Sequence, residues 1–576
     1  MKTTDNSAPT THMPIPRRQP WMAPAIMVAI ACAVVVAMGP AVDGEFLNWD
    51  DDRNFVENIA FRGWGPSQWA WAWRTDHLGV WQPLSWMLFG AQWCWAGLTA
   101  RTYHVVSLAL HALNCMILYV VIARILTLSQ LPSAQRSAGW NRVFALAATL
   151  LFAVHPLRVE AVAWISAQPY LPAAFFYLLA ILSYLEYRSP TRTHGRGRWL
   201  FGTILFFAIA VLFKAVAITL PIVLFILDFY PLRRRGAGLL MDKVPFIILA
   251  VPVCIWAIAA KDAGASRAPL SEFSADARLA HAAYGLIFYL VKTIVPGDLS
   301  PYYSLPKNLS LAHGRFALMA GLVVAVTVLA LLMRRRWPGL LVAWVAYVVI
   351  LLPNLGLIQI SQQLAADRYS YLAMMPWTAL LAGLLSVTAR REGLRRAGMA
   401  PAVLFLALLA GGGLTWASRS QSRIWKNSTN LWSRALEVEP DGAVAHCNLG
   451  EALMRQGRYG DASFYLSRAI DRDPEFAFAY SNFAVLLCNA ERFEDAVVAA
   501  ERALGANPPL TGRDLARVHA VLGQAYAGLR KDELAMQHTL KARELGFIEA
   551  DKMIEYLRRF RGEIPPSSQP AAPIKD

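Results

Sequence analysis

Charged residues are scarce in this 576-residue chain: they make up 16% of it, against about 25% in an average soluble domain. This shortage excludes an ordinary soluble globular protein. Cysteine is also rare, and none of the six cysteines forms a CxxC pair. Three of them, Cys32, Cys115 and Cys254, lie in hydrophobic segments, where a thiol behaves as a small apolar group. The cysteines therefore indicate no particular function.

Hydrophobic residues, in contrast, make up 56% of the chain. Its 20 tryptophans and 19 tyrosines fit the aromatic belts that membrane proteins place at the level of the lipid headgroups. A net charge of +16 can indicate nucleic-acid binding. Here, however, the arginines cluster in short loops between hydrophobic segments, which is the orientation signal of a multi-pass membrane protein. We therefore expect the lipid bilayer, and no nucleic acid, as a partner.

Eleven hydrophobic segments are predicted to cross the bilayer, which takes roughly 20 apolar residues. The first follows Arg17 and Arg18 and is interpreted as a retained signal-anchor. A further apolar stretch, 281–296, is ambiguous. The predicted spans are 22–42, 103–126, 142–156, 168–187, 198–213, 214–230, 244–260, 315–333, 339–353, 368–388 and 400–418.

Five basic clusters orient these spans, because positive charge stays on the cytoplasmic side. All five can be cytoplasmic only if 281–296 lies in the interface or is re-entrant. This arrangement predicts a cytoplasmic tail at 1–21 and a C-terminal region outside. Without obvious eukaryotic targeting features, we expect a bacterial inner membrane and a periplasmic C-terminal region. The clusters are Arg136; Arg188, Arg192, Arg196 and Arg198; Arg233, Arg234, Arg235 and Lys243; Arg334, Arg335 and Arg336; Arg390, Arg391, Arg395 and Arg396.

The C-terminal region is predicted to be a separate helical domain, 426–561, that follows a transmembrane domain at 22–420. Pro440, Pro474 and Pro508 are spaced by 34 residues, and NLG at 448–450 recurs 34 residues later as NFA. A 34-residue period is that of the tetratricopeptide repeat, whose units are helix pairs stacked into a solenoid with a concave binding surface. The repeats are expected to bind a protein or peptide. The last stretch, 562–576, is rich in proline and serine and is predicted to be disordered.

The predicted topology collects polar residues at the outer membrane face. The outer loop 43–102 carries an acidic cluster, and three other loops bring further ionisable residues to the same face. Clustered carboxylates at a membrane surface favour a catalytic base or a metal site, while the alternative is a solvated loop that caps a helix. The sequence shows no well-spaced set of metal ligands, so we expect no protein metal site, although a divalent cation could accompany the substrate. The candidates are Asp50, Asp51, Asp52 and His77 in the loop, with His155, Glu160, Lys214 and Arg368 beyond it.

Several motifs resemble one family, the TMTC-type protein O-mannosyltransferases and their bacterial relatives in the GT-C class of glycosyltransferases. LFAVHP at 151–156 with VEAVA at 159–163 is the most specific match. The tetratricopeptide tail completes the resemblance, which covers nearly the whole chain. The other matching motifs are NWDDD at 48–52 with VEN at 56–58, WQPLS at 81–85, HALN at 111–114, LSPYYSLP at 299–306 and DRYSYL at 367–372.

The resemblance implies an all-α, GT-C-like membrane domain followed by the repeat solenoid. It also implies transfer of a sugar, mannose in the family's name, from a polyprenyl-phosphate carrier to a hydroxyl on a protein. Two departures bear on the substrate. Many relatives carry Lys-Glu where this chain has Lys214-Ala215, and an acidic residue near 167–170, where this chain has AQPY. The resemblance therefore supports the reaction type more than the sugar.

The resemblance maps the family's acidic pair to Asp50 and Asp51, with Asp51 expected to be the base or the closest partner of the base, and Asp50 to support it. Displacement at an anomeric carbon needs a carboxylate to take the acceptor's proton. Lys214 and Arg368 are expected to stabilise the leaving phosphate, unless the first snorkels to the interface and the second forms a structural ion pair with Asp367. His155 and Glu160 are expected to orient the substrate or the base, unless His155 only caps a helix before Pro156. His77 is a weaker candidate for binding the substrate.

Two other classes of protein compete with this enzyme. A non-catalytic membrane scaffold would use the repeats to hold an outer-face complex together. A transporter of lipid-linked sugars should place ionisable groups near the bilayer midplane and show repeated groups of spans. The charged groups gather at one predicted face instead, which counts against a transporter.

Overall fold

In the computed structural model, the all-α class predicted from the sequence is confirmed, since 78% of the chain is helical and strands are almost absent from the described part. The predicted tails 1–21 and 562–576 and the cluster at 390–396 lie outside the described residues. The structure describes residues 22–129, 138–189, 194–236, 238–263, 273–306, 308–357, 363–388, 399–507 and 510–560.

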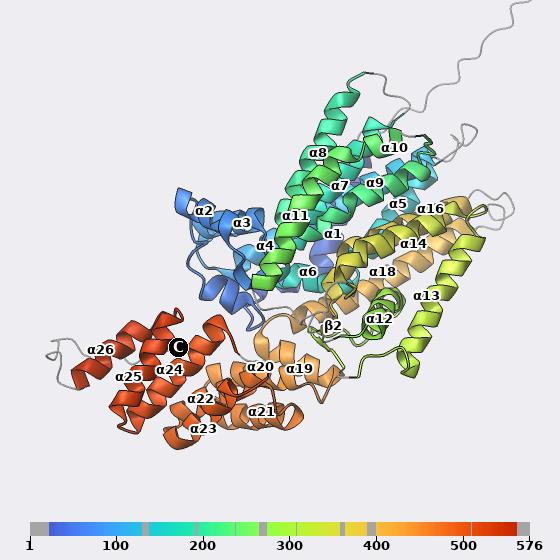
Figure 1. Cartoon of the computed structure of the whole chain (residues 1–576). Coiled ribbons are helices and arrows are strands. Elements are labelled where there is room, and N and C mark those ends of the chain that lie inside the picture. Colours follow the sequence, from blue (N-terminus) through green and yellow to red (C-terminus); the bar gives the residue numbers. More distant parts are fainter. Residues whose placement is uncertain are drawn as a thin grey trace, which may run out of the picture.

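The membrane domain is a bundle of apolar helices around α7, which packs against α4 and α8 (Figure 1). Helices at the periphery expose apolar side chains, such as Leu332 on α13 and Leu408 on α18, as expected for a lipid-facing surface. The helices of this bundle are α1 (Met22–Met38), α4 (Ala100–Leu128), α5 (Ala138–Ala153), α6 (Val159–Ala163), α7 (Tyr170–Tyr187), α8 (Arg196–Phe213), α9 (Leu220–Phe229), α10 (Gly238–Met241), α11 (Val244–Ala263), α12 (Ala275–Ile294), α13 (Gly314–Leu332), α14 (Pro338–Leu351), α15 (Ser370–Ala373), α16 (Met375–Thr388) and α18 (Met399–Ile424).

Six of the described helices are long and apolar enough to cross a bilayer, and the number is eight if each of two bent helix pairs is one span. The bent pairs are α5 with the 156–163 segment and the 367–373 segment with α16. Three shorter apolar helices of the bundle cover 215–229, 244–260 and 338–354. All these helices coincide with the eleven predicted spans.

The ambiguous stretch 281–296 falls on α12, which does not meet the criteria for a span. In Figure 1 it is seen almost along its axis, across the direction of α13 and α14. It packs against α13 and against β2 (Gln363–Ala365), which pairs antiparallel with β1 (Tyr303–Ser304). The interfacial or re-entrant placement of 281–296 stays a prediction from the charge pattern.

The outer loop is folded into short elements that lie beside the bundle. Two helices, α2 (Pro66–Arg74) and α3 (Pro83–Ala96), enclose an aromatic core that includes Trp86. Both begin with a proline in the first turn, which lacks the N–H that a helix leaves unpaired there. The 3₁₀ and π segments are η1 (Gly39–Asp43), η2 (Asp52–Val56), η3 (His77–Gly79), η5 (Pro156–Arg158), η6 (Ile165–Ala167), η7 (Ala215–Thr219), η8 (Leu352–Asn354) and η9 (Asp367–Tyr369).

The repeat domain follows α18 directly and lies against the outer loop (Figure 1). After α19, its helices pair as the 34-residue period predicts: α20 with α21, α22 with α23, and α24 with α25. The recurring asparagines of the repeats, Asn448 and Asn482, are natural candidates for holding a peptide backbone, but the Asn482 side chain is buried and donates to the Cys447 sulfur, so that expectation is wrong for Asn482. The helices are α19 (Ser428–Val438), α20 (Ala443–Arg455), α21 (Tyr459–Arg472), α22 (Ala477–Asn489), α23 (Phe493–Leu504), α24 (Gly512–Gly528), α25 (Asp532–Glu544) and α26 (Ala550–Phe560).

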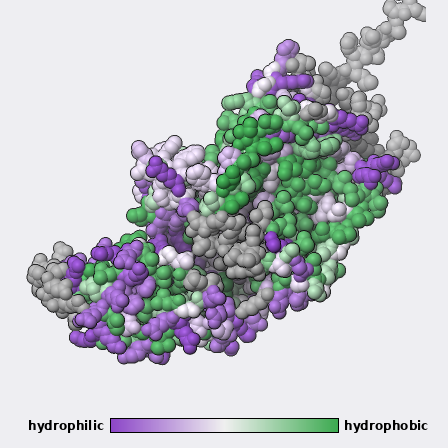
Figure 2. All heavy atoms as spheres, in the orientation of Figure 1, coloured by the Kyte–Doolittle hydropathy of each residue, from purple (hydrophilic) through white to green (hydrophobic). Residues whose placement is uncertain are grey.

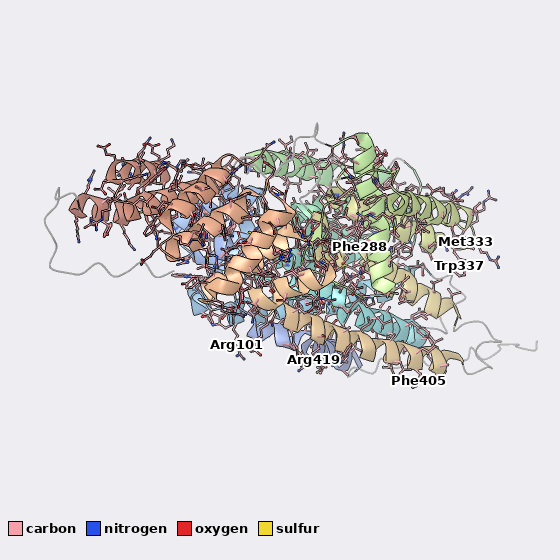
Figure 3. The ribbon with its side chains drawn as sticks, turned by 90° about the horizontal axis from the view of Figure 1, so that it is seen from below. Arg101, Phe288, Met333, Trp337, Phe405 and Arg419 are labelled. Atoms are coloured by element: carbon pink, nitrogen blue, oxygen red, sulfur yellow. The ribbon has the colours of Figure 1, made fainter. Side chains whose placement is uncertain are left out.

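The surface has the apolar band that a bundle crossing a bilayer needs. Figure 2 shows a hydrophobic band over the bundle between two hydrophilic ends, one of them the repeat domain. Figure 3 places Met333 and Trp337 at the end far from the repeats, and these residues flank the arginines at 334–336. Because basic loops stay in the cytoplasm, the repeats should face the opposite compartment.

A reporter fusion tests this topology. In bacteria, alkaline phosphatase fused after residue 560 should be active, because that enzyme folds only outside the cytoplasm. β-Galactosidase fused at the same point should be inactive, and the reverse pair of results would place the repeats and the outer loop in the cytoplasm.

Candidate active site in the outer loop

The acidic cluster forms a tight turn between η1 and η2. Asp50 has a left-handed backbone, with φ of 65°, a conformation that aspartate adopts more readily than most non-glycine residues. The N–H of Asn54 donates to the Asp50 carbonyl at 2.8 Å, which closes the first turn of η2. The turn thus points the two consecutive carboxylates, Asp50 and Asp51, into different surroundings.

Asp51 is fully buried, and hydrogen bonds occupy both of its carboxylate oxygens. One oxygen accepts from the Leu47 N–H at 3.1 Å, and the other accepts from the N–H and the hydroxyl of Ser166. Burial raises the pKa of Asp51 to about 8, against the lowering effect of these hydrogen bonds. Asp51 therefore joins the outer loop to the 165–167 turn.

Asp50 is half-buried, and no residue in the described part of the chain donates a hydrogen bond to its carboxylate. Burial raises its pKa, while Arg53, Arg368 and Lys214 lie near enough to lower it. Asp50 therefore differs from Asp51, whose two carboxylate oxygens both accept hydrogen bonds.

Glu160 binds Arg368. The predicted topology had placed both residues at the same membrane face. The guanidinium forms an ion pair with the Glu160 carboxylate, whose other oxygen accepts from the Arg368 N–H at 2.8 Å. The rings of Trp164 and Tyr369 lie 4.9 and 4.8 Å from the guanidinium carbon. Asp367 accepts instead from the Tyr303 hydroxyl at 3.0 Å. Glu160 therefore orients the cation, and the partner of Arg368 is Glu160 rather than Asp367.

Lys214 is the residue that caps the C-terminal end of α8. Its Nζ donates to Oε1 of Gln82 at 3.1 Å and lies 5.2 Å from the centre of the Tyr170 ring. Gln82 belongs to the WQPLS motif of the outer loop. The lysine therefore contacts the outer loop.

The two candidate histidines lie near the site but are engaged elsewhere. The His155 Nδ1 accepts from the Leu157 N–H at 3.2 Å, and its Nε2 lies 3.0 Å from the Thr293 carbonyl, so it caps η5 and binds α12. The His77 Nε2 lies 3.3 Å from the Arg53 carbonyl, and its ring packs on Trp86. Burial lowers the pKa of His77 and favours its neutral form. Both histidines therefore support the site's framework.

Sequence reasoning missed Ser166, Gln82 and Trp164, each of which contacts a candidate residue. The Trp164 Nε1 also donates to the Trp49 carbonyl at 2.8 Å. These contacts join residues more than 100 positions apart, and no spacing signal marks them. Among the described residues, no group of three histidine, cysteine or acidic side chains is arranged to hold a metal ion.

Comparison with known proteins finds a tetratricopeptide repeat in the C-terminal domain and a loose likeness to one solved structure. A tetratricopeptide-repeat model matches residues 443–476, which span α20 and α21. The solved structure of ArnT from Cupriavidus metallidurans bound to undecaprenyl phosphate aligns over 90% of this chain and 80% of that one. Its identity is 14% and its TM-score 0.34, which denotes only a loose likeness.

Curated relatives match part of the chain. Protein O-mannosyl-transferase Tmtc1 of Drosophila melanogaster is 38% identical over 24% of this chain and 14% of its own length. Human TMTC1 is 31% identical over 30% of this chain and 19% of its own length, and human TMTC4 is 27% identical over 37% and 29%. The matching segments thus span between 14% and 29% of the length of these relatives. It is similar, over these segments, to the TMTC protein O-mannosyltransferases that its motifs resemble, and it carries a tetratricopeptide repeat near its C-terminus.

Proposed function

We propose that this chain is an integral-membrane glycosyltransferase that moves a sugar from a polyprenyl-phosphate carrier to a protein hydroxyl. The observation that supports this most is the Asp50 carboxylate, which has no hydrogen-bond donor among the described residues and lies near Arg53, Arg368 and Lys214. A lone base beside several cations suits a reaction that removes a proton and releases a phosphate. The similarity to protein O-mannosyltransferases makes mannose the first sugar to test.

In this mechanism, the acceptor oxygen attacks the anomeric carbon while Asp50 takes the hydroxyl proton. The new carbon–oxygen bond forms as the bond between the anomeric carbon and the carrier's phosphate oxygen breaks. The polyprenyl phosphate leaves with the bonding electrons, and Arg368 and Lys214 stabilise the charge that develops on it. Asp51 does not exchange a proton in this scheme; it fixes the turn that presents Asp50.

The proposal also implies how the donor and the acceptor reach the site and in which membrane the chain lies. The donor's hydrocarbon tail would reach the site from the bilayer, and the repeats would bring the protein acceptor to it. The chain would lie in a bacterial inner membrane with its repeats in the periplasm. A divalent cation, if the reaction uses one, would arrive with the donor phosphate.

The decisive experiment is an in vitro transfer assay. The purified full-length chain is incubated with several polyprenyl-phosphate sugars and a protein acceptor, and transfer is measured by mass spectrometry. Transfer from at least one donor supports the enzyme. Absence of transfer from all of them, by protein that is correctly folded, would favour the membrane scaffold.

The transfer rate should depend on pH through Asp50. A general base works only when deprotonated, and burial raises the pKa of Asp50, so the rate should rise with pH at values above the ordinary aspartate pKa of 3.8. Arg53 lowers this pKa, so Arg53→Gln should move the acidic limb to higher pH. Profiles of transfer rate against pH for both proteins check this, and an unmoved limb would exclude Asp50 as the titrating group.

A further inference from the structure

The repeat domain contacts the residue two positions before Asp50. The Asn48 side-chain oxygen accepts from the Trp432 Nε1 at 2.7 Å, and its amide nitrogen donates to the Asn448 carbonyl at 2.9 Å. The Asn48 N–H also donates to the Ser428 hydroxyl at 3.0 Å. Asn48 is buried, so these bonds form away from water and fix both its side chain and its main chain.

The repeats also contact the residues that follow the pair of aspartates. Asp52 forms an ion pair with Arg455 at 3.0 Å, and Arg53 forms one with Asp514 at 2.6 Å. Arg455 belongs to α20 and Asp514 to α24, while Phe478 of the intervening α22 packs on the Arg53 guanidinium. Three consecutive repeat units therefore contact Asp52 or Arg53. The first helices of the units face the outer loop along the side expected to be concave.

Asp50 lies between these two sets of contacts, in a left-handed backbone conformation that needs support from its surroundings. We propose, on the basis of the proposed function, that the repeat domain is part of the frame of the active site: Trp432, Ser428 and Asp514 are positioning residues that hold Asn48 and Arg53 and so fix the Asp50 carboxylate. None of the three touches the reacting atoms.

This role differs in its kinetics from recruitment of the acceptor. Repeats that only bind the acceptor affect KM, and they affect it most for long acceptors. Repeats that position the base affect kcat for every acceptor, including a short peptide. A displacement of about 1 Å at a reacting group lowers the rate by roughly 10²-fold. We therefore expect kcat to fall about 10–100-fold when several of these contacts are removed, with KM for a short peptide little changed.

The test uses the full-length chain with replacements only on the repeat side. Trp432→Phe removes the N–H that binds Asn48, Ser428→Ala removes the hydroxyl, and Asp514→Asn removes the charge that pairs with Arg53. The kcat and KM of each variant are measured alone and in combination. If one variant does not fold, the remaining variants still test the proposal. Asp514→Glu, which keeps the charge, should restore most of kcat.

Asp495→Asn is the matched control. Asp495 pairs with Arg492 at 2.6 Å on an exposed part of the neighbouring unit, so this variant makes the same chemical change away from the loop and should keep wild-type kcat. Hydrogen–deuterium exchange gives a second readout that needs no activity. The N–H groups of Leu47 and Asn54, which donate within the loop, should exchange faster in the combined variant and not in the control.

The two readouts separate the possible results. Lower kcat and faster exchange support the proposal. Wild-type kcat, or unchanged exchange at Leu47 and Asn54, would overturn it. If the wild-type chain transfers no sugar, the proposed function fails, and the exchange rates alone still show whether the repeats hold the loop.

Discussion

Replacing Asp50 with asparagine is expected to lower sugar transfer by about 10²–10⁴-fold, the usual contribution of a general base. Asparagine has nearly the same shape and cannot take the proton. Because no described residue donates a hydrogen bond to the Asp50 carboxylate, the replacement should leave folding unchanged. The measurement is single-turnover transfer with the purified variant, alongside its thermal unfolding.

Asp51→Asn is the control, and its expected result is different. Asparagine offers one oxygen where Asp51 accepts from Leu47 and from Ser166, so the variant should lower stability by about 1–3 kcal/mol through the donors left unsatisfied. Its transfer rate should fall less than that of Asp50→Asn. A folded Asp51→Asn protein without activity, beside an active Asp50→Asn protein, would return the base to Asp51, the residue expected from the motif.

Replacing Glu160 with alanine should give the largest loss of stability. Arg368 would then remain buried without its carboxylate, and breaking a buried pair in this way costs about 3–5 kcal/mol. Glu437→Ala is the comparison, because Glu437 is exposed and pairs with Arg434 near the surface. This variant should lower the free energy of unfolding by only about 0–1 kcal/mol. Thermal unfolding in detergent measures both. Equal stabilities for the two variants would show that Arg368 finds another partner.

Features that depend on period and hydropathy could be predicted from the sequence. The 34-residue period located the repeat helices, and hydropathy located the apolar helices of the bundle; α12, which holds most of 281–296, is not among the helices long and apolar enough to cross a bilayer. Topology alone brought Glu160, Lys214 and Arg368 to one face. The repeat period, the hydropathy and the loop charge are each averages over many residues. One atypical residue therefore does not change the prediction.

The assignment of roles within the site could not be predicted in the same way. Asp50 and Asp51 are neighbours of identical chemistry, and they differ only because the left-handed turn at Asp50 directs Asp51 to Leu47 and Ser166. The role of His155 could not be predicted either, because a histidine before a proline can cap a helix or bind a ligand. In the structure its two ring nitrogens contact the Leu157 N–H and the Thr293 carbonyl, so it acts as a cap. Such outcomes depend on contacts between distant segments.

The contacts of Asn48 have a consequence for biosynthesis. Asn48 emerges soon after the first span, yet Ser428 is 380 residues further along the chain. At translation rates of about 5–20 residues per second, the loop waits roughly 20–80 s for its partner. Until the repeats are made, the Asn48 amide and the three aspartates lack their contacts with the repeat domain. We therefore expect a ribosome-bound intermediate whose membrane domain is inserted but whose outer loop is not yet held in place. If the proposed function holds, sugar transfer would begin only after the repeats have been synthesised, so chains that still lack them would not consume the lipid-linked donor.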